Sequence, residues 1–355
     1  MAPFFQTLTL AILSLTPSAF SIPTRRQEAD CLHCRDEAHG FASLNGGTFG
    51  GRDGDVVVAT SHKELVDFAS QQGPLIIRVE GEIVSDPTGY EIPIASNKTI
   101  IGIGDSAHLV GGGFSIAGTS NIILRNLQVS DTHLVDDWPG KTKDWDGIQV
   151  DTGTNIWIDH VKVSYPTEQH FNSLVQGRLA NFFLHAQFAR MNDGLIDLRK
   201  DSDYVTVSNC ILSEHNKAFG IGWTQNVTAK VTINNNFFNS TSARNPSADN
   251  LHMCHMYNNY HRNLTSYGNY ARGATQMLVE TSYFERVNDP LVAGPNATIK
   301  SNWLVFKDCE GQIMLDVKSE SVFDASDYYE YTLQDPYDLP NDVPYFAGPD
   351  EEIGS

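Results

Sequence analysis

The chain has 355 residues, of which 41% are hydrophobic and 19% are charged, and this composition excludes an intrinsically disordered protein. Asp and Glu outnumber Lys and Arg by 43 to 24, giving a formal net charge of -19 at pH 7. So acidic a chain argues against nucleic acid as a partner. No apolar run is long enough to span a bilayer, so we expect no membrane partner either.

The first 39 residues predict a secretory leader and a processing segment. Residues 5–15 form a short apolar run, and Ala19-Phe20-Ser21 matches a small-x-small cleavage pattern. We expect a signal peptide over residues 1–21, a linker over residues 22–39, and a secreted, extracellular protein. Arg25-Arg26 is either a dibasic processing site or an ordinary exposed pair.

Cysteines and glycosylation sequons give the same picture of the cellular compartment. Five cysteines are an odd number, so at least one is free or paired outside the chain. We expect a local disulfide between Cys31 and Cys34, and buried thiols at Cys210 and Cys254. Sequons of the N-x-Ser/Thr type, which predict a glycoprotein, begin at Asn97, Asn226, Asn239, Asn263 and Asn296.

From about residue 97 the chain repeats a short β-branched strand followed by Asn, Gly or Ser. Eight such units start at residues 97, 121, 155, 204, 230, 251, 276 and 297, so successive starts differ by 24, 34, 49, 26, 21, 25 and 21 residues. A period near 24 with turn asparagines predicts an all-β protein, a parallel β-helix over residues 40–320. Leucine-rich repeats have similar periods, but their Leu-x-x-Leu-x-Leu spacing is absent.

Asparagines recur at one point of successive units. Asn209, Asn235 and Asn258 are separated by 26 and 23 residues. They are either stacked, with their amides bonded along the stack, or separate turn residues chosen for left-handed geometry.

Two intervals between strands are longer than one coil. They contain residues 131–143 and about 165–190, which flank two aspartate blocks and are expected to form the walls of a cleft. Alternatively, an extra coil starting at Asn181 would divide the 49-residue interval into 26 and 23 residues. Both interpretations stay open.

The last segment, residues 321–355, carries nine acidic residues and no Lys or Arg, together with several tyrosines. We expect an irregular tail that packs its aromatic side chains along the solenoid wall and ends in a solvated acidic stretch. An acidic interaction tail is the alternative.

The two aspartate blocks are Asp144-Trp145-Asp146 and, running from Asp193 to Asp197, Asp-Gly-Leu-Ile-Asp. Positions i and i+2, or i and i+4, of a strand share a face, so each block can direct two carboxylates to one place. Two such pairs can hold one Ca²⁺ ion, which prefers several oxygen ligands. One block alone would be read as turn-forming residues.

Lys217 and Arg244 follow these blocks, and the four aspartates with these two cations indicate calcium-assisted catalysis. Asp159-His160 resembles an acid–base pair, but we expect it to support neighbouring coils. The other histidines show no metal-ligand spacing.

These motifs, in this order, resemble the family 1 pectate lyases, and more closely their secreted fungal members. The resemblance covers most of residues 40–310 and is carried by stretches beginning at Gly40, Asn121, Asp144, Asn155 (Asn-Ile-Trp-Ile-Asp-His), Asp193, Asp203 and His255. It implies a right-handed, single-stranded parallel β-helix and calcium-dependent β-elimination of polygalacturonate. The implied partner is pectate, an anionic plant cell-wall polysaccharide, and we expect a monomer.

The resemblance also implies roles for individual residues. Asp146, Asp193 and Asp197 match the calcium ligands, and Asp144 matches an additional ligand of some members. Arg244 matches the catalytic base, Lys217 a residue that neutralises a uronate carboxylate, and Arg199 and Arg272 substrate contacts. Because arginine is ordinarily protonated, a base at Arg244 favours alkaline conditions, with an optimum above about pH 8.

One position departs from the family pattern Arg-x-Pro-x-x-Arg. The matching stretch runs from Arg244 to Asp249, so an aspartate replaces the second arginine. An anion beside an anionic sugar adds repulsion, unless Asp249 binds Ca²⁺ or pairs with Arg244. The alternatives are therefore a pectin or rhamnogalacturonan lyase, a glycoside hydrolase, or a non-catalytic carbohydrate-binding β-helix.

Overall fold

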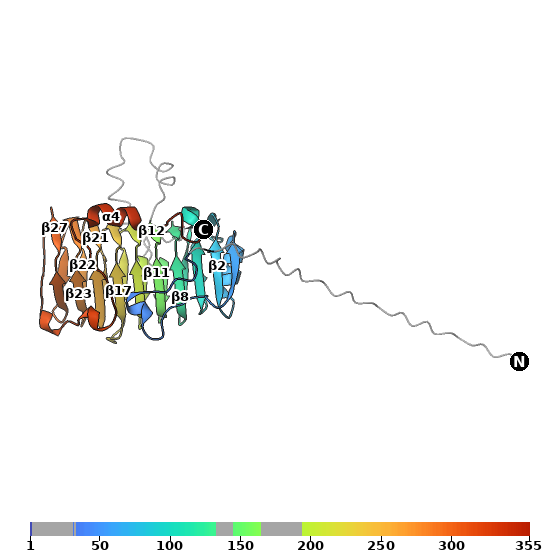
Figure 1. Ribbon diagram of the computed structural model, residues 1–355, viewed down its shortest axis with the longest axis horizontal. Coiled ribbons are helices and arrows are strands. Elements are labelled where there is room, and N and C mark those ends of the chain that lie inside the picture. Colours follow the sequence, from blue (N-terminus) through green and yellow to red (C-terminus); the bar gives the residue numbers. More distant parts are fainter. Residues whose placement is uncertain (2–30, 32, 133–144, 165–193) are drawn as a thin grey trace, which may run out of the picture. The chain divides into compact units, whose positions relative to one another are not determined.

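The computed structural model describes residues 1, 31, 33–132, 145–164 and 194–355. In residues 31–355 the strands form three parallel sheets, here called sheets A, B and C, and each coil from β2 to β25 contributes one strand to each (Figure 1). The parallel β-helix expected from the repeat, and its right-handed form expected from the resemblance, are confirmed.

The three sheets take the following strands. Sheet A contains β1 (Asp55–Ala59), β2 (Leu75–Val79), β5 (Lys98–Gly102), β8 (Ser120–Arg125), β11 (Thr154–Asp159), β14 (Asp203–Ser208), β17 (Lys230–Asn234), β20 (Met253–Tyr257), β23 (Gln276–Glu280) and β26 (Thr298–Asn302). Sheet B contains β3 (Glu82–Val84), β6 (His108–Val110), β9 (Gln128–Ser130), β12 (Lys162–Ser164), β15 (Ile211–Ser213), β18 (Phe237–Asn239), β21 (Tyr260–Leu264), β24 (Tyr283–Val287) and β27 (Val305–Lys307). Sheet C contains β4 (Tyr90–Pro93), β7 (Gly112–Ala117), β10 (Asp146–Asp151), β13 (Gly194–Arg199), β16 (Phe219–Gly222), β19 (Ser247–Asp249), β22 (Asn269–Arg272) and β25 (Leu291–Ala293).

The eight repeated units of the sequence are the last eight strands of sheet A, in chain order from β5 to β26. From β2 to β23 the inward positions form a continuous apolar row, because each residue pairs in register with its counterpart in the next coil. In β26 the next position is Ser301, so the apolar row ends there. The row is Ile77, Ile100, Leu124, Ile158, Val207, Ile233, Met256 and Val279. All eight side chains are buried, and each such burial stabilises the fold by about 1.5–3 kcal/mol.

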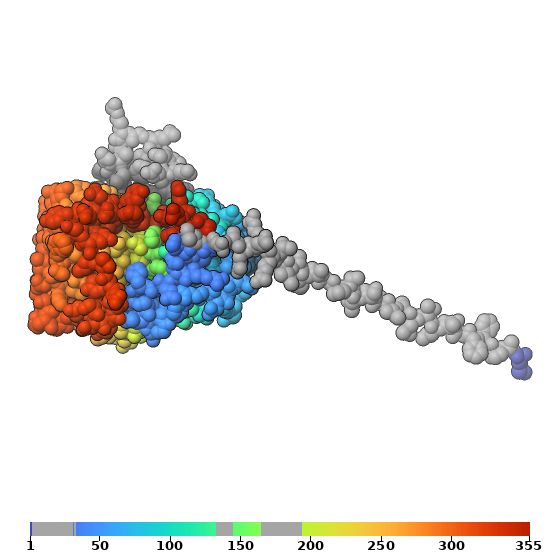
Figure 2. Space-filling view, viewed as in Figure 1, coloured from blue at the N-terminus to red at the C-terminus, as the bar shows by residue number. Residues whose placement is uncertain are grey.

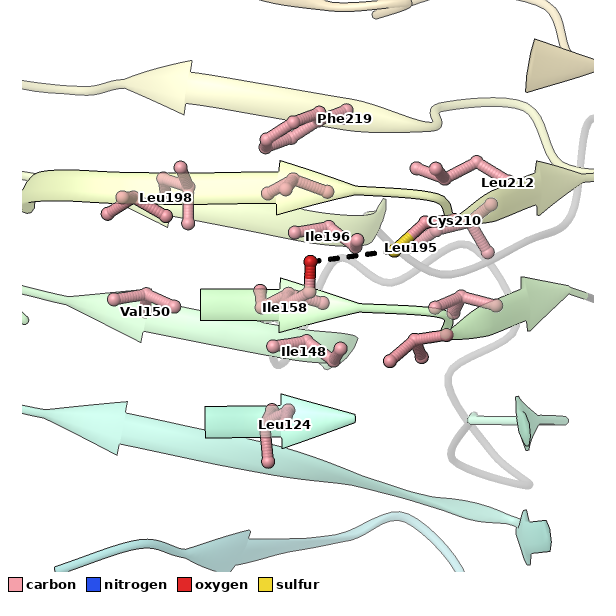
Figure 3. Close-up of a cluster of buried hydrophobic side chains, with 14 of the residues drawn as sticks. Leu124, Ile148, Val150, Ile158, Leu195, Ile196, Leu198, Cys210, Leu212 and Phe219 are labelled. Carbon is pink, nitrogen blue, oxygen red and sulfur yellow. Dashed lines mark hydrogen bonds between the residues drawn. The ribbon is translucent and has the colours of Figure 1, made fainter. Parts of the chain in front are cut away.

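The same apolar filling continues across the interior to sheets B and C. Figure 3 shows Ile158 facing residues of sheet C such as Ile196 and Leu198, while Cys210 donates its thiol hydrogen to the carbonyl oxygen of Ile158 at 3.7 Å. Burial raises the pKa of the Cys210 thiol far above its usual range, so this cysteine acts as a small apolar side chain. The expectation of a buried thiol is confirmed here and at Cys254.

Short helices lie outside the sheets. They are η1 (Gly40–Ser43), α1 (His62–Ser70), η2 (Gly104–Ser106), η4 (Ser319–Ser321), η5 (Ala325–Asp327) and α4 (Leu339–Phe346). Helix α1 begins where the Ser61 hydroxyl accepts a hydrogen bond from the Glu64 amide and the Glu64 carboxylate accepts one from the Thr60 amide. This capping box starts a helix whose Leu65 and Ala69 are fully buried in the main core.

The turn asparagines are left-handed turn residues, and two of the three are also bonded along the stack, whereas the Asn209 amide donates to Asp159. Asn209, Asn235 and Asn258 all have left-handed backbones, with φ of 50°, 57° and 54°. The Asn258 amide also donates to Asn235 Oδ1 at 3.4 Å. A second, buried row contains Asn236 and Asn259, joined at 3.2 Å.

Asp159 has the structural role expected of it. Its buried carboxylate accepts hydrogen bonds from Ser208 and Asn209 of the next coil and lies 2.8 Å from Arg125 Nε and 2.7 Å from His160 Nδ1. Burial alone would raise the pKa of Asp159, but the hydrogen bond and charge of His160 and the charge of Arg125 hold it well below its usual range.

The coils on either side of residues 165–193 are direct neighbours. Strand β10 pairs with β13, β11 with β14 and β12 with β15, so no coil separates them. Residues 165–190, and most of residues 131–143, which were expected to form cleft walls, lie outside the described part of the chain.

The C-terminal segment lies against coils that are far apart in the sequence. Figure 2 shows it in red, crossing the surface from the orange coils toward the blue residues of the N-terminal part. Leu339 and Val343 of α4 pack on Phe237, Tyr260 and Tyr283 of sheet B.

Hydrogen bonds fix this segment at both ends. Tyr329 Oη lies 2.8 Å from Thr232 Oγ1 and 2.6 Å from His255 Nδ1, both in sheet A. Near the C-terminus, the Asn126 amide donates to the carbonyl oxygens of Asp350 and Ile353.

A disulfide bond joins Cys31 to Cys34, as expected from the sequence. In the parts of the chain that the structure describes, no helix is both long and apolar enough to cross a membrane.

A row of stacked rings in sheet B encloses a histidine. His261 lies between Phe238, with ring centroids 4.7 Å apart, and Phe284, with centroids 4.5 Å apart. Burial lowers the pKa of His261 to about 3, so the imidazole is neutral in the folded protein.

We expect this histidine to destabilise the protein in acid. Its pKa is lower in the folded than in the unfolded chain, so its contribution is fully present above the ordinary value of 6.5 and is lost as pH falls toward 3. A His261→Phe variant should lose up to about 1.4 kcal/mol per pH unit of this dependence. Urea denaturation at several pH values would measure it, and an unchanged pH slope would contradict the assignment.

Candidate functional site

The candidate residues that the structure describes lie on or beside sheet C. Asp146 begins β10, Asp197 and Arg199 lie in β13, and Arg272 ends β22. Lys217 directly precedes β16, and Arg244 precedes β19. Asp144 and Asp193 lie outside the described residues, although each is adjacent in sequence to a described one.

Two carboxylates converge beside Gly194. Asp146 and Asp197 are 0% and 1% exposed. A β-carbon placed on Gly194 would lie 3.0 Å from Asp146 Oδ1 and 2.9 Å from Asp197 Oδ1, so both oxygens border the space that a side chain would take. Gln149 Nε2 donates to the other oxygen of Asp146 at 3.2 Å, and the Gly220 amide donates to Asp197 Oδ1 at 3.0 Å.

Arg244 reaches these carboxylates from two coils away. Its Nη1 forms an ion pair with Asp197 Oδ2 at 3.3 Å. The backbone of Arg244 is left-handed, with φ 62°. The next residue, Asn245, is fully buried, and its carbonyl oxygen accepts a hydrogen bond from the Asn269 amide. The residue that presents Arg244 is therefore anchored in the core.

The coil between Asp197 and Arg244 leaves a passage for the guanidinium. Gly220 pairs in register with Asp197, and a β-carbon there would lie 2.6 Å from Asp197 Oδ1 and 2.3 Å from the Trp223 ring. The guanidinium carbon of Arg244 lies 5.0 Å from the centre of the Trp223 ring. Gly220 thus provides space, and Trp223 provides a surface on which the cation stacks.

Removing that surface should weaken catalysis without destroying the site. In a Trp223→Ala variant we expect the reaction that the family resemblance implies, elimination of polygalacturonate, to slow about three- to ten-fold, because a cation–π contact of this kind stabilises the cation's position by about 0.5–1.5 kcal/mol. Trp223→Phe should retain most of the rate. Trp303→Ala is a matched control, since Trp303 is also exposed, at 53% against 48%. Equal rates for the two alanine variants would contradict the role of Trp223.

A second guanidinium group, that of Arg199 in β13, lies close enough to Arg244 for their charges to interact. Arg199 pairs in register with Asp151, and its Nε lies 3.3 Å from Asp151 Oδ1. Burial lowers the pKa of Arg199, and the positive charge of Arg244 adds to this effect while Glu91 opposes it. The two guanidinium groups can attract an anionic ligand, and the two buried carboxylates beside them can hold a cation. This region is therefore suited to an anionic ligand that binds together with a metal cation.

Glu91 borders the site and was not anticipated from the sequence. Its Oε1 accepts a weak hydrogen bond from the Asp146 amide at 3.4 Å. Burial raises the pKa of Glu91 to about 7, against the opposing effects of that hydrogen bond and of Arg199. No pattern in the sequence points to it, because Glu91 lies 55 residues before Asp146 and belongs to no recognisable motif.

The other predicted cations lie at different distances from this centre. Lys217 forms a backbone bridge with Ala243, the residue before Arg244, so the two cations come from adjacent points of neighbouring coils. Arg272 is exposed, stacks at 5.3 Å on Tyr270, and lies three coils from β13, which is about 14 Å by the usual strand spacing. Arg272 is therefore the predicted cation farthest from the carboxylates of Asp146 and Asp197.

Asp249 faces the coil that contains Arg272. The two residues pair in register, and Asp249 Oδ1 lies 2.5 Å from the position of a β-carbon on Gly273. Strand β19 is two coils from β13, so Asp249 lies about 10 Å along the stack from the strand that carries Asp197.

The residues fit a calcium ion in the kind of ligand that they offer. Two buried carboxylates converge on one small space, and carboxylate oxygens are the preferred ligands of Ca²⁺. Within the described residues no group of three or more His, Cys, Asp or Glu side chains could hold a metal. The remaining two predicted ligands, Asp144 and Asp193, are among the residues that the structure does not describe.

Comparison with known proteins identifies the family. A family model described as pectate lyase matches residues 12–336. A pectate lyase of Emericella nidulans is 32% identical over 295 residues, covering 81% of this chain and 79% of the relative. A pectate trisaccharide-lyase of Thermotoga maritima is 33% identical over 238 residues, covering 64% of this chain and 57% of the relative. The chain thus spans a little over half of the length of the Thermotoga protein.

Solved structures show the same fold. A pectate lyase of a Bacillus strain, in complex with trigalacturonate, matches with a TM-score of 0.70 at 23% identity, covering 89% of this chain and 99% of that one. A pectate lyase of Xanthomonas campestris matches with a TM-score of 0.67 at 20% identity, covering 90% and 100%. These likenesses define a pectate lyase-like parallel β-helix. From the family match and its relatives, the chain belongs to the pectate lyase family.

Proposed function

We propose that this protein is a secreted, calcium-dependent polysaccharide lyase of the fungal type, which cleaves (1→4)-α-D-galacturonan by β-elimination. The observation that carries the proposal is the Arg244 guanidinium, held 3.3 Å from the buried Asp197 carboxylate and close to the convergent Asp146. The family match and the sequence relatives support it. The leader expected over residues 1–21 supports the secreted location.

Elimination requires a proton to leave C5 of a uronate, next to its carboxylate. Arg244 would take this proton, the bond from C4 to the leaving oxygen would break, and that oxygen would take up a proton to become a hydroxyl. Lys217 and Arg199 would neutralise substrate carboxylates, and Arg272 would contact a more distant sugar. A calcium ion held by Asp144, Asp146, Asp193 and Asp197 would supply further stabilisation of the negative charge that develops.

The product distinguishes this reaction from its competitors. A lyase forms a conjugated double bond between C4 and C5, which absorbs ultraviolet light, whereas a glycoside hydrolase forms only reducing ends. Assays on polygalacturonate, methylated pectin and rhamnogalacturonan, with Ca²⁺ and with a chelator, should show absorbance that depends on Ca²⁺. Reducing ends without absorbance would establish a hydrolase, and binding of a polysaccharide without either signal would support a binding protein.

Asp249 bears on whether the protein prefers a charged or a methylated galacturonan. Its carboxylate lies beside Arg272, so it would reduce the attraction of this end of the site for a charged uronate. An Asp249→Arg variant should gain about 10–100-fold in kcat/KM for polygalacturonate relative to methylated pectin, because one charged contact contributes about 1.5–3 kcal/mol. Glu320→Arg, an exposed charge reversal outside sheet C, is the control. The same preference in both variants would rule out a selective role.

A further inference from the structure

One of the five sequon asparagines borders a surface cavity. Asn97 is exposed just before β5 and lines a cavity of about 380 Å³. The cavity is also lined by Phe49, Gly50, Arg52, Asp53, Pro74 and Asn121. None of the other four sequon asparagines lines it. The cavity lies at the turn that leads into sheet A, away from the candidate site on sheet C.

The amide of Asn97 is oriented by its neighbour in the next coil. Asn121 Nδ2 donates to Asn97 Oδ1 at 2.8 Å, while Asn121 Oδ1 accepts from the amides of Phe49 and Gly50 at 2.7 Å each. Asn97 Nδ2, the atom to which an N-linked sugar is attached, has no hydrogen-bond partner among the described residues. By contrast, Nδ2 of the sequon residue Asn226 donates to Asp201 at 2.9 Å.

The cavity has the surface that a sugar ring needs. Phe49, which is 36% exposed, and Pro74 provide apolar contact for the C–H face of a sugar. Asp53 provides a carboxylate for its hydroxyl and amide groups. Arg52 is already engaged, because Nη1 donates to Glu37, Nη2 donates to the Arg35 carbonyl oxygen, and the guanidinium lies 4.8 Å from the centre of one face of the Phe49 ring. A sugar would therefore meet the part of Phe49 that Arg52 leaves exposed. A volume of about 380 Å³ lies within the range of pockets that hold small ligands.

We propose that Asn97 carries an N-linked glycan whose first N-acetylglucosamine occupies this cavity against Phe49. In the attachment step a bond forms between Asn97 Nδ2 and C1 of the sugar. The bond from C1 to a lipid diphosphate carrier breaks, the carrier leaves as the free diphosphate, and Nδ2 loses a proton. The inference rests on the secretory route included in the proposed function.

The test uses the full chain, expressed with its own leader in a yeast or filamentous fungus. Mass spectrometry of glycopeptides should find hexosamine on Asn97. Peptide N-glycosidase, which cuts the bond between Nδ2 and the first sugar, should release the Asn97 glycan at least ten-fold more slowly from the folded than from the heat-denatured chain. In a Phe49→Ala variant, whose fold is checked by circular dichroism, this protection should be lost.

Results other than these would refute the glycan at Asn97, the position of its first sugar, or the secretory route. An unmodified Asn97 in a chain that carries a glycan at another sequon refutes the inference and leaves the secreted location intact. A secreted chain without any glycan also refutes it, while a chain retained in the cell refutes the secretory route itself. Release at equal rates from folded and denatured protein refutes the seated sugar, as does protection that persists in Phe49→Ala. None of these results affects the lyase assay.

Discussion

An Arg244→Ala variant should eliminate at a rate about 10²–10⁴-fold below that of the wild type, because this is the usual contribution of a positioned group that accepts a proton. Arg244→Lys should lose nearly as much, since an ammonium cannot reproduce both the stacking on Trp223 and the contact with Asp197. The rate is measured from the ultraviolet absorbance of the unsaturated product. The loss should lie in kcat more than in KM.

Arg262→Ala is a matched control for this experiment. Arg262 also stacks on an aromatic ring, at 4.8 Å from the centre of Phe237, but it belongs to sheet B. Its removal should leave the rate unchanged. A wild-type rate in Arg244→Ala, with the fold intact by circular dichroism, would remove Arg244 from the reaction.

An Asp197→Asn variant should lose calcium binding and activity together. The substitution keeps the shape of the side chain and an oxygen for the Gly220 amide, but it removes the buried charge that a cation requires. We expect Ca²⁺ affinity, measured by calorimetry with calcium chloride alone, to fall at least about 100-fold, beyond the 10–100-fold cost of losing an outer partner of a metal site. Activity at a fixed low Ca²⁺ concentration should fall in proportion.

The two variants separate the roles of cation and anion. Arg244→Ala should bind Ca²⁺ at least as well as the wild type, because it removes a positive charge from beside Asp197. Asp203→Asn is the carboxylate control, since Asp203 pairs with Lys230 at 2.8 Å in sheet A and is remote from the site. If Asp197→Asn retained wild-type Ca²⁺ affinity, the carboxylates would not be ligands.

The sequence predicted sheet A well and the other sheets poorly. The strands of sheet A have five or six residues with β-branched side chains facing inward, so the repeat is visible in the sequence. Strands such as β12 (Lys162–Ser164) and β19 (Ser247–Asp249) have three residues, too few for an alternating pattern to be recognised. The expected coil length nevertheless implied that further strands complete each coil.

The candidate site could be predicted only where its residues form motifs. Asp146 and Asp197 belong to recognisable blocks, and Arg244 follows from the family resemblance. The roles of Gly220 and Trp223 beside the Arg244 guanidinium could not be predicted, because they depend on the order in which the coils stack. The register places the coil that contains these two residues between the coils of Asp197 and Arg244. The raised pKa of Glu91 likewise depends on burial, which no local pattern of charges reveals.

The C-terminal segment has a consequence for how the protein folds. In a stacked repeat protein each coil contacts only its neighbours, so coils can form or fray one at a time. Here the Asn209 carbonyl oxygen accepts a hydrogen bond from the Gly348 amide, and the Asn126 amide donates to the carbonyl oxygens of residues 350 and 353, so this segment bridges coils that precede it by more than 130 residues. These contacts join residues more than 130 positions apart, which slows folding but couples the coils into one cooperative unit. The final twenty residues therefore determine whether the stack unfolds stepwise or as a whole.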